Sequence, residues 1–174
     1  MSTLIYPSIT EYRLPKKNII VISCIDLRLT DDVLNFLHFD NLTNRYDHVA
    51  LAGTSVSTGA TREEHKKLFK KEALEQYDSF AHWKQCLYDH IAIAIALHAI
   101  EDVYIIEHED CGAYRAFLID STFASWEEEV KCHKKFAVAL SKDIQALYKL
   151  NVHCFMIDIR GNVKLLDTAP VIKP

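Results

Sequence analysis

The chain has 174 residues, of which 49% are hydrophobic and 25% are charged, and its formal net charge at pH 7 is −4. This length and composition favour a single domain over residues 1–174, with a full hydrophobic core and an N-terminal arm at about residues 1–17. The acidic balance excludes a general electrostatic attraction to nucleic acid or to an anionic membrane.

The first half of the chain contains two predicted strands separated by a helix. The apolar run at residues 18–23 is typical of a buried parallel strand, and a second strand is expected at residues 48–51. Between them, a helix begins with Thr30 or Asp31 as its N-cap. The side chains expected to face inward from this helix are Val33, Leu34 and Leu37. Residues 52–61 carry glycine, threonine and serine and are expected to form a loop.

The middle of the chain is predicted to be mainly helical. Thr61 and Glu64 have capping-box spacing, which predicts a helix that ends before Tyr77. A longer helix is expected over residues 79–99, followed by a strand at residues 102–107. The residues that recur at helical spacing and mark the buried face of the longer helix are Phe80, Trp83, Leu87, Ile91, Ala94, Ile95 and His98.

The last part of the chain adds one helix and one strand. Ser125 and Glu128 have capping-box spacing and open a predicted helix to about residue 150, and a fourth strand at residues 152–159 ends at a turn. Strands that alternate with helices predict an α/β fold, with a parallel four-stranded sheet flanked by helices. We expect the strand order 2-1-3-4, with room for an extra edge strand, because this order lets residues 24 and 108 meet at a topological switch point.

Two short motifs follow directly on predicted buried strands. Cys24-Ile25-Asp26-Leu27-Arg28 follows the first strand, and His108-Glu109-Asp110-Cys111-Gly112 follows the third. Open α/β sheets place their sites at the carboxyl ends of the strands. Two thiolates and an imidazole are ligands that zinc favours, and a catalytic zinc keeps its fourth position for water or substrate. The sequence therefore predicts one Zn²⁺ per chain, bound by Cys24, His108 and Cys111.

Asp26 and Arg28 are two positions apart, so in an extended segment their side chains face the same side. A guanidinium would keep the carboxylate ionised and fix its orientation. The free oxygen of Asp26 is then expected to accept a hydrogen bond from a zinc-bound water. If the ion pair breaks, Asp26 is expected to become a fourth zinc ligand and close the site.

The combination of Cys-x-Asp-x-Arg with a later His-x-x-Cys-Gly resembles the β-class carbonic anhydrases. The strand at residues 102–108, and the closing strand through Met156-Ile157-Asp158 with its turn at Gly161, are also similar to that family. The resemblance covers roughly residues 16–167. It implies a β-carbonic anhydrase-like fold and a lyase in which zinc-bound hydroxide hydrates CO2 reversibly to bicarbonate.

The resemblance also assigns roles to individual residues. It places Cys24, His108 and Cys111 in the metal-ligand positions, and Asp26 with Arg28 in the position of the catalytic dyad. The backbone around Gly112 is expected to bind substrate or anionic product, as a helix beginning there would favour. The family is usually dimeric or built from dimers, so the expected partners are CO2 or bicarbonate and a second copy of the chain.

Two segments depart from the family pattern, and alternatives to the lyase stay open. The polar segment at about residues 61–86 is longer than the short family members need. The chain has Ala50-Leu51-Ala52-Gly53 where the family usually carries Arg-Asn-Ala-Gly. One alternative is the same fold and zinc site acting on another small CO2-like substrate, such as COS or CS2. Another is a non-catalytic zinc protein in which Asp26 permanently completes a closed shell. A third is a thiol redox protein that uses Cys24 and Cys111.

The remaining histidines and cysteines have simpler interpretations. His82, His90 and His98 are expected to be ordinary core or surface histidines, although His90 or His98 could approach the site as a proton relay. The residues expected to be small buried hydrophobes are Cys86, Cys132 and Cys154. His133 is expected to lie on a solvated helix face.

The sequence shows neither a targeting segment nor a nucleic-acid patch. Its first residues lack the basic and apolar regions of a secretory signal, and the apolar stretch at residues 91–100 is too short to span a bilayer. Lysines and glutamates intersperse in residues 63–75, as in helical i, i+4 pairs. We therefore expect a cytoplasmic protein that binds neither nucleic acid nor membrane.

Overall fold

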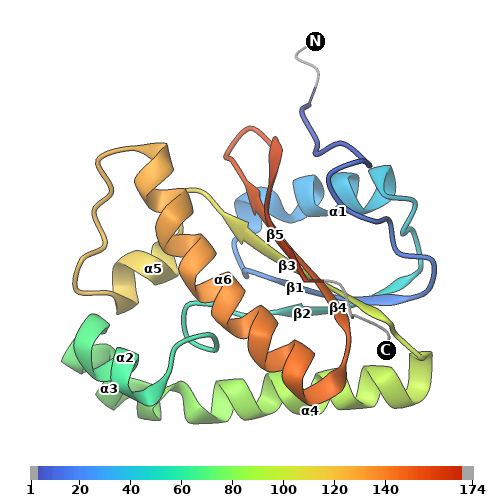
Figure 1. Ribbon diagram of the computed structural model, residues 1–174. Helices are drawn as coiled ribbons and strands as arrows, with labels where there is room; N and C mark the ends of the chain where they lie inside the picture. Colours follow the sequence, from blue (N-terminus) through green and yellow to red (C-terminus); the bar gives the residue numbers. More distant parts are fainter. Residues whose placement is uncertain (1–3, 170–174) are drawn as a thin grey trace.

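The computed structural model describes residues 4–169 and shows an α/β fold with a five-stranded central sheet (Figure 1). The order of the strands is β2-β1-β3-β4-β5. Their bounds are β1 (Ile19–Ser23), β2 (Tyr46–Ala50), β3 (Asp102–His108), β4 (Asn151–Ile157) and β5 (Val163–Ala169).

The first four strands confirm the predicted order 2-1-3-4. Neighbouring strands among them pair in parallel, and Ile22 of β1 lies between Val49 of β2 and Ile105 of β3. The fifth strand pairs antiparallel with β4, so the sheet is mixed rather than purely parallel. The chain reverses between β4 and β5 through a turn in which the Asp158 carboxylate accepts hydrogen bonds from the backbone of residues 160 and 162.

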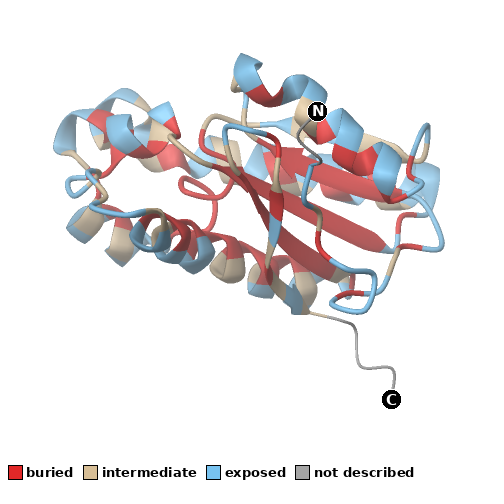
Figure 2. Cartoon of the chain, turned by 90° about the horizontal axis from the view of Figure 1, so that it is seen from above, coloured by how far each residue is buried: buried red, intermediate tan, exposed pale blue. Residues whose placement is uncertain are grey.

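Helices cover both faces of the sheet. Their bounds are α1 (Thr30–Phe39), α2 (Arg62–Leu68), α3 (Lys71–Gln76), α4 (Ala81–His98), α5 (Gly112–Phe117) and α6 (Trp126–Tyr148), with short 3-10 helices η1 (Leu27–Leu29) and η2 (Asp78–Phe80). Helix α1 packs on one face, and α4 and α6 pack on the other (Figures 1 and 2). The sheet between these layers is almost wholly buried except at β2 and β5, the two edge strands.

The alternation of side chains along the strands explains the two layers. Tyr104 and Ile106 of β3 face α1, whereas Val103 and Ile105 face α4 and α6. A third hydrophobic cluster lies beneath the loop at residues 52–60 and joins α2, α3 and α5. Residues 4–17 form neither a helix nor a strand, and within them Tyr12 is buried on the α1 face.

The predicted capping signals agree with the structure fully at Thr61 and in part at Ser125, but not at the start of α1. Thr61 forms the complete predicted capping box with Glu64. Ser125 caps α6 by accepting from the backbone N–H of Glu128, whose carboxylate bonds the N–H of Ala124 instead of Ser125. Helix α1 begins at Thr30, but its N-cap is Leu29, because η1 leads directly into it.

The predicted helix from Thr61 to Tyr77 is broken into α2 and α3. Phe69 leaves the helical conformation and pairs with Leu118 as an antiparallel bridge. The backbone N–H of Lys70 then donates to the carbonyl of Phe117 over 2.8 Å. Contacts with a segment nearly fifty residues away therefore override the local helical pattern.

Two predicted buried positions are wrong. Leu34 is exposed, since the buried face of α1 is formed by Val33, Phe36 and Leu37. His98 is also exposed at the end of α4, where its Nδ1 lies 2.7 Å from Asp47 of β2. Within α4 the buried residues are Leu87, Ile91 and Ala94, and Phe80 is buried just before the helix.

No helix within residues 4–169 combines the length and the apolar character that crossing a bilayer requires.

Candidate metal centre

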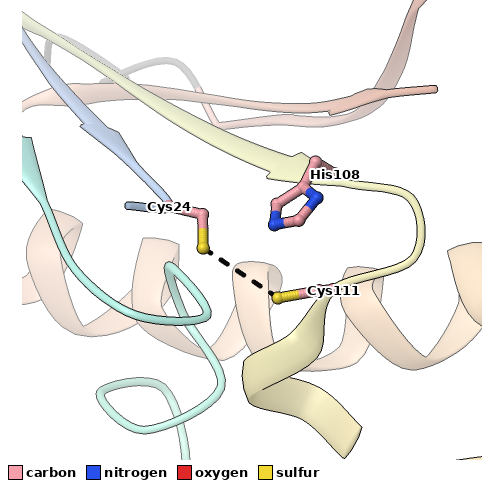
Figure 3. A group of neighbouring side chains, drawn as sticks. All are labelled: Cys24, His108 and Cys111. Atoms are coloured by element: carbon pink, nitrogen blue, oxygen red, sulfur yellow. Dashed lines mark hydrogen bonds between the residues drawn. The ribbon is translucent and has the colours of Figure 1, made fainter. Parts of the chain in front are cut away.

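The structure brings Cys24, His108 and Cys111 together at the carboxyl end of the sheet (Figure 3). Cys24 directly follows β1, His108 is the last residue of β3, and Cys111 is the N-cap of α5. Because β1 and β3 are parallel neighbours, their carboxyl ends lie side by side. One ligand atom from each side chain lies within 4.8 Å of the others, and the two sulfur atoms are 4.0 Å apart.

This geometry fits a zinc ion. With zinc–sulfur bonds of about 2.3 Å, two thiolates on a tetrahedral zinc lie about 3.8 Å apart. Nδ1 of His108 lies 2.8 Å from the carbonyl oxygen of Glu109 and donates to it. This bond leaves the lone pair on Nε2, which is buried and has no hydrogen-bond partner among the described residues. A buried nitrogen without a partner, next to two sulfurs, is what a metal would satisfy.

The protonation of the two thiols is strongly unequal. The hydrogen bond from Cys111 lowers the pKa of Cys24 to about 4, with His108 and the backbone N–H of Gly53 assisting against burial. The same bond and burial raise the pKa of Cys111 far above its usual value. Burial lowers the pKa of His108, but the sulfur of Cys24 outweighs it, so the net shift is upward. Metal binding would release the remaining protons from this cluster.

Asp26 lies beside the cluster, and Arg28 holds it in place. Nε and Nη2 of Arg28 donate to the two carboxylate oxygens over 2.9 and 2.7 Å, and the backbone N–H of Arg28 donates over 3.0 Å. Oδ2 of Asp26 is 3.9 Å from Nε2 of His108. The bonds from Arg28 lower the pKa of Asp26 to about 2. The fixed carboxylate of Asp26 therefore lies close to any metal ion that Cys24, His108 and Cys111 would bind.

A second carboxylate anchors Arg28 on its other side. Nη1 of Arg28 donates to Oδ2 of Asp110 over 2.9 Å, and Nη2 donates to the Asp110 carbonyl over 3.0 Å. Asp110 also pairs with Arg115 at 2.5 Å. The two sequence motifs are thus joined by an ion-pair network as well as by the ligand atoms.

A cavity of about 290 Å³ opens onto Cys24, Asp26 and His108. Most of the other lining residues are apolar: Ile25, Leu29, Val33, Ala50, Ile106 and Ile157. The polar ones are Ser23, Thr30 and His48. The small side chain of Ala50 therefore forms part of the wall at the position where the sequence departs from the family pattern.

His48 was not singled out from the sequence. It lies on the edge strand β2, is exposed, and its Nε2 is 2.7 Å from Oγ of Ser23. Burial of part of the ring lowers the pKa of His48. In contrast, His82, His90 and His98 are exposed on α4 and do not line the cavity.

Gly112 opens α5 and is exposed. It does not line the cavity next to Cys24, and α5 has only six residues. A role of its backbone in binding substrate stays a prediction.

Two interpretations of individual side chains are wrong. His133 is fully buried, and its Nδ1 lies 2.8 Å from Glu107, so α6 does not present it to solvent. Cys86 is exposed, whereas Cys132 is half-buried and Cys154 is buried as expected. A signal for the first error was available, because Glu107 directly follows the apolar run at residues 103–106 of the predicted strand, and a carboxylate buried there requires partners.

Comparison of the sequence with known proteins finds relatives whose names describe no function. No protein-family model matches the chain. An uncharacterized protein of Rickettsia bellii is 24% identical over 146 residues, which are 83% of this chain and 79% of that protein. An uncharacterized protein of Rickettsia conorii is 26% identical over 155 residues, covering 87% and 73% of the two chains.

Solved structures provide the clearer likeness. The β-carbonic anhydrase CafD of Aspergillus fumigatus superposes with a TM-score of 0.56 at 10% identity, covering 92% of this chain and 95% of CafD. The β-carbonic anhydrase CcaA gives 0.52 at 13% identity, covering 95% and 81% of the chains. CafA, another β-carbonic anhydrase of A. fumigatus, gives 0.50 at 15% identity, covering 92% and 78%. The chain is therefore a divergent example of the β-carbonic anhydrase fold.

Proposed function

We propose that the protein is a zinc-dependent lyase that hydrates CO2 reversibly to bicarbonate. The observation that carries this proposal is the buried, unpartnered Nε2 of His108 beside two sulfur atoms, where His108 lines a mainly apolar cavity. The likeness of the fold to β-carbonic anhydrases supports it.

Cys24, His108 and Cys111 would hold the zinc ion. Zinc bound by three protein ligands supplies a water whose pKa is lowered towards neutrality. Asp26 would orient that water, because Arg28 fixes both carboxylate oxygens and only their remaining lone pairs can accept. The apolar wall of the cavity would hold CO2 and exclude competing water.

A proton must leave the site in each hydration cycle. We propose that His48 accepts it, since its ring lines the cavity and is also exposed to solvent. Burial lowers the pKa of His48, so its imidazole is neutral at pH 7, has a lone pair for the incoming proton and releases that proton readily to buffer. Ser23, bonded to the ring, would hold it in that position.

Stopped-flow CO2 hydration with zinc-loaded protein tests the proposal. We expect wild-type activity well above that of Cys24→Ser and His108→Ala, together with one zinc per chain by elemental analysis. Equal rates for all three proteins would exclude the lyase. Zinc binding without hydration, with Asp26 as a fourth ligand at every pH, would instead support the non-catalytic alternative.

One observation favours a second substrate class. Ala50 lines the cavity where the family usually carries arginine, so no arginine or lysine of this wall attracts bicarbonate. An apolar wall suits COS or CS2 at least as well as CO2. Assays of CO2, COS and CS2 on the same zinc-loaded sample separate the two functions. Cys24→Ser should abolish whichever activity is present, which would show that the activity depends on the metal site.

We also propose that the protein acts as a homodimer. Ile25 and Leu27, on either side of Asp26, are 64% and 86% exposed, and β2 is an edge strand with no partner on one side within the described residues. Burial of these apolar side chains against a second copy would close the cavity mouth. Light scattering should give twice the chain mass, and a monomer at all concentrations would exclude the dimer.

A further inference from the structure

Glu107 is a fully buried carboxylate at the end of an apolar strand, directly before His108. Four hydrogen bonds reach it. Oε1 accepts from the backbone N–H of Ser55 over 3.1 Å and from the Ser55 hydroxyl, and Oε2 accepts from the Tyr114 hydroxyl over 3.1 Å and from Nδ1 of His133 over 2.8 Å. Four donors saturate the acceptor capacity of a carboxylate.

One side of Glu107 fixes the turn that contacts Cys24. Ser55 belongs to the turn at residues 51–58, and the hydroxyl of Thr54 ties the same turn to the carbonyl of Ile106 over 3.2 Å. Within this turn the backbone N–H of Gly53 donates to the sulfur of Cys24 over 3.2 Å. The position of that N–H therefore depends on the anchor that Glu107 provides two residues later.

The other side of Glu107 fixes the helix that begins after Cys111. Tyr114 lies in the first turn of α5, whose N-cap is Cys111. His133 of α6 stacks on the Tyr114 ring with the centroids 3.6 Å apart, so both donors hold each other in place. Glu129, one turn earlier on α6, accepts from the backbone N–H of Asp110 over 2.7 Å.

We propose that Glu107 is a positioning residue for the metal centre. A single buried carboxylate joins the segments that carry all three ligands: it is covalently next to His108, it anchors the turn that bonds Cys24, and it anchors the helix that Cys111 caps. A site held in this way loses little conformational freedom when a metal binds, and the N–H bond to the thiolate keeps the sulfur oriented. This proposal rests on the metal-binding part of the proposed function and not on CO2 hydration.

The test compares two buried carboxylates. Glu107→Gln keeps the size of the side chain and one acceptor oxygen, but its amide nitrogen cannot accept from Tyr114 and His133. Asp40→Asn is the matched control, because Asp40 is also buried and accepts from the hydroxyls of Tyr12 and Tyr104, of which only Tyr104 lies on a ligand-bearing segment, four residues before His108. The zinc dissociation constant is measured by competition with a chromophoric chelator, and the stability of each metal-free variant by urea unfolding.

We expect Glu107→Gln to weaken zinc binding about tenfold or more, as is typical when a group that orients ligands is lost. Asp40→Asn should leave the dissociation constant within about twofold at a similar loss of stability. Equal dissociation constants for wild type and Glu107→Gln would overturn the proposal. An equal loss in both variants would also overturn it, because the effect would then follow stability alone.

A milder pair keeps the test valid if Glu107→Gln does not fold. Tyr114→Phe and Tyr12→Phe each remove one hydroxyl from a buried carboxylate. We expect a several-fold loss of zinc affinity and a shifted thiolate-to-cobalt absorption band in the Co²⁺ form of Tyr114→Phe, and neither in Tyr12→Phe. Identical spectra and affinities in the two variants would overturn the proposal. Wild-type protein that binds no zinc would refute the metal site itself, which is a different result.

Discussion

The orientation of Asp26 is fixed by an arginine that is itself held in place. Arg28 donates to both oxygens of Asp26, and Asp110 holds the guanidinium from the opposite side. A planar guanidinium can make this two-point contact, whereas a lysine ammonium is a point charge and cannot. The orientation of Asp26 towards His108 is thus a property of the arginine fork rather than of charge alone.

Replacing the guanidinium of Arg28 by a lysine ammonium should lower the activity without changing the zinc content. We expect Arg28→Lys to lower CO2 hydration about 10- to 100-fold, the usual cost of losing an outer-shell partner, with zinc content unchanged. Arg115→Lys is the control, because Arg115 pairs with Asp110 but not with Asp26. Stopped-flow rates and zinc analysis on both variants check this, and equal rates would show that the fork is dispensable.

His48 makes a separate prediction about proton transfer. His48→Ala should lower kcat in weak buffer about 100-fold, within the range that a positioned acid or base supplies, and leave kcat/KM unchanged. Added imidazole should restore kcat because it replaces the missing ring. His90→Ala, on the exposed side of α4, should change nothing. A kcat that imidazole does not restore would indicate that His48 has no part in proton transfer.

The sequence was sufficient to predict the three residues that the structure brings together as a possible metal site, because each motif directly follows a recognisable buried strand. Glu107 and His133 could not be paired in the same way. His133 lies among lysines and glutamates on α6, a local pattern typical of solvent exposure, and only the packing of that helix onto the sheet buries it. Likewise, His48 becomes part of the cavity only because β2 pairs with β1.

At the scale of elements, strand order was predictable and the break between α2 and α3 was not. The order followed from placing two motifs at one switch point. The break depends on the bridge between Phe69 and Leu118, which no local sequence pattern predicts. The strand β5 was predicted only as a possible extra edge strand, and it pairs antiparallel with β4 after the turn at Asp158.

The turn at residues 51–58 contacts the candidate metal centre, because the backbone N–H of Gly53 donates to the sulfur of Cys24. Gly53 has φ +75°, and a Cβ there would lie 2.5 Å from Val56 and 2.9 Å from Ala113. We expect Gly53→Ala to lower the free energy of unfolding by about 2 kcal/mol or more, because the left-handed conformation alone costs about 1–2 kcal/mol. Zinc affinity should fall as well, since the N–H bonded to Cys24 must move.

Gly112→Ala serves as the control for that variant. Gly112 has no neighbouring atom within 4 Å of a built Cβ, so the change should alter stability by less than about 1 kcal/mol. Urea unfolding of the two metal-free variants gives the comparison. Similar stabilities would mean that the turn accommodates a side chain at Gly53.

For the molecule as a whole, the proposed metal would join elements that are distant in sequence. Cys24, His108 and Cys111 connect β1, β3 and α5, so a zinc ion at this site would bind the folded chain in preference to the unfolded one. At free zinc about 100 times the dissociation constant, the expected gain in stability is about 2.7 kcal/mol. Thermal unfolding with zinc and with a chelator should show it, and Cys24→Ser should remove most of the difference. An equal gain in that variant would place the metal elsewhere.

The stability of the whole fold should also depend on pH through Asp40, the buried residue at the end of α1. Burial raises the pKa of Asp40 above 3.8, against the opposing effects of the hydroxyls of Tyr12 and Tyr104 and of the charge on His153. At pH values between the unfolded and the folded pKa, Asp40 therefore binds more protons in the folded state than in the unfolded state. The contribution of protonated Asp40 to stability is complete below the unfolded pKa and is lost as pH rises through the folded pKa. The unfolding free energy of wild type relative to Asp40→Asn should accordingly fall as pH rises from about 4, the unfolded value, and then level off. Urea unfolding of both metal-free proteins across that range measures the difference, and a difference that grows with pH would show that the tyrosine hydroxyls outweigh burial.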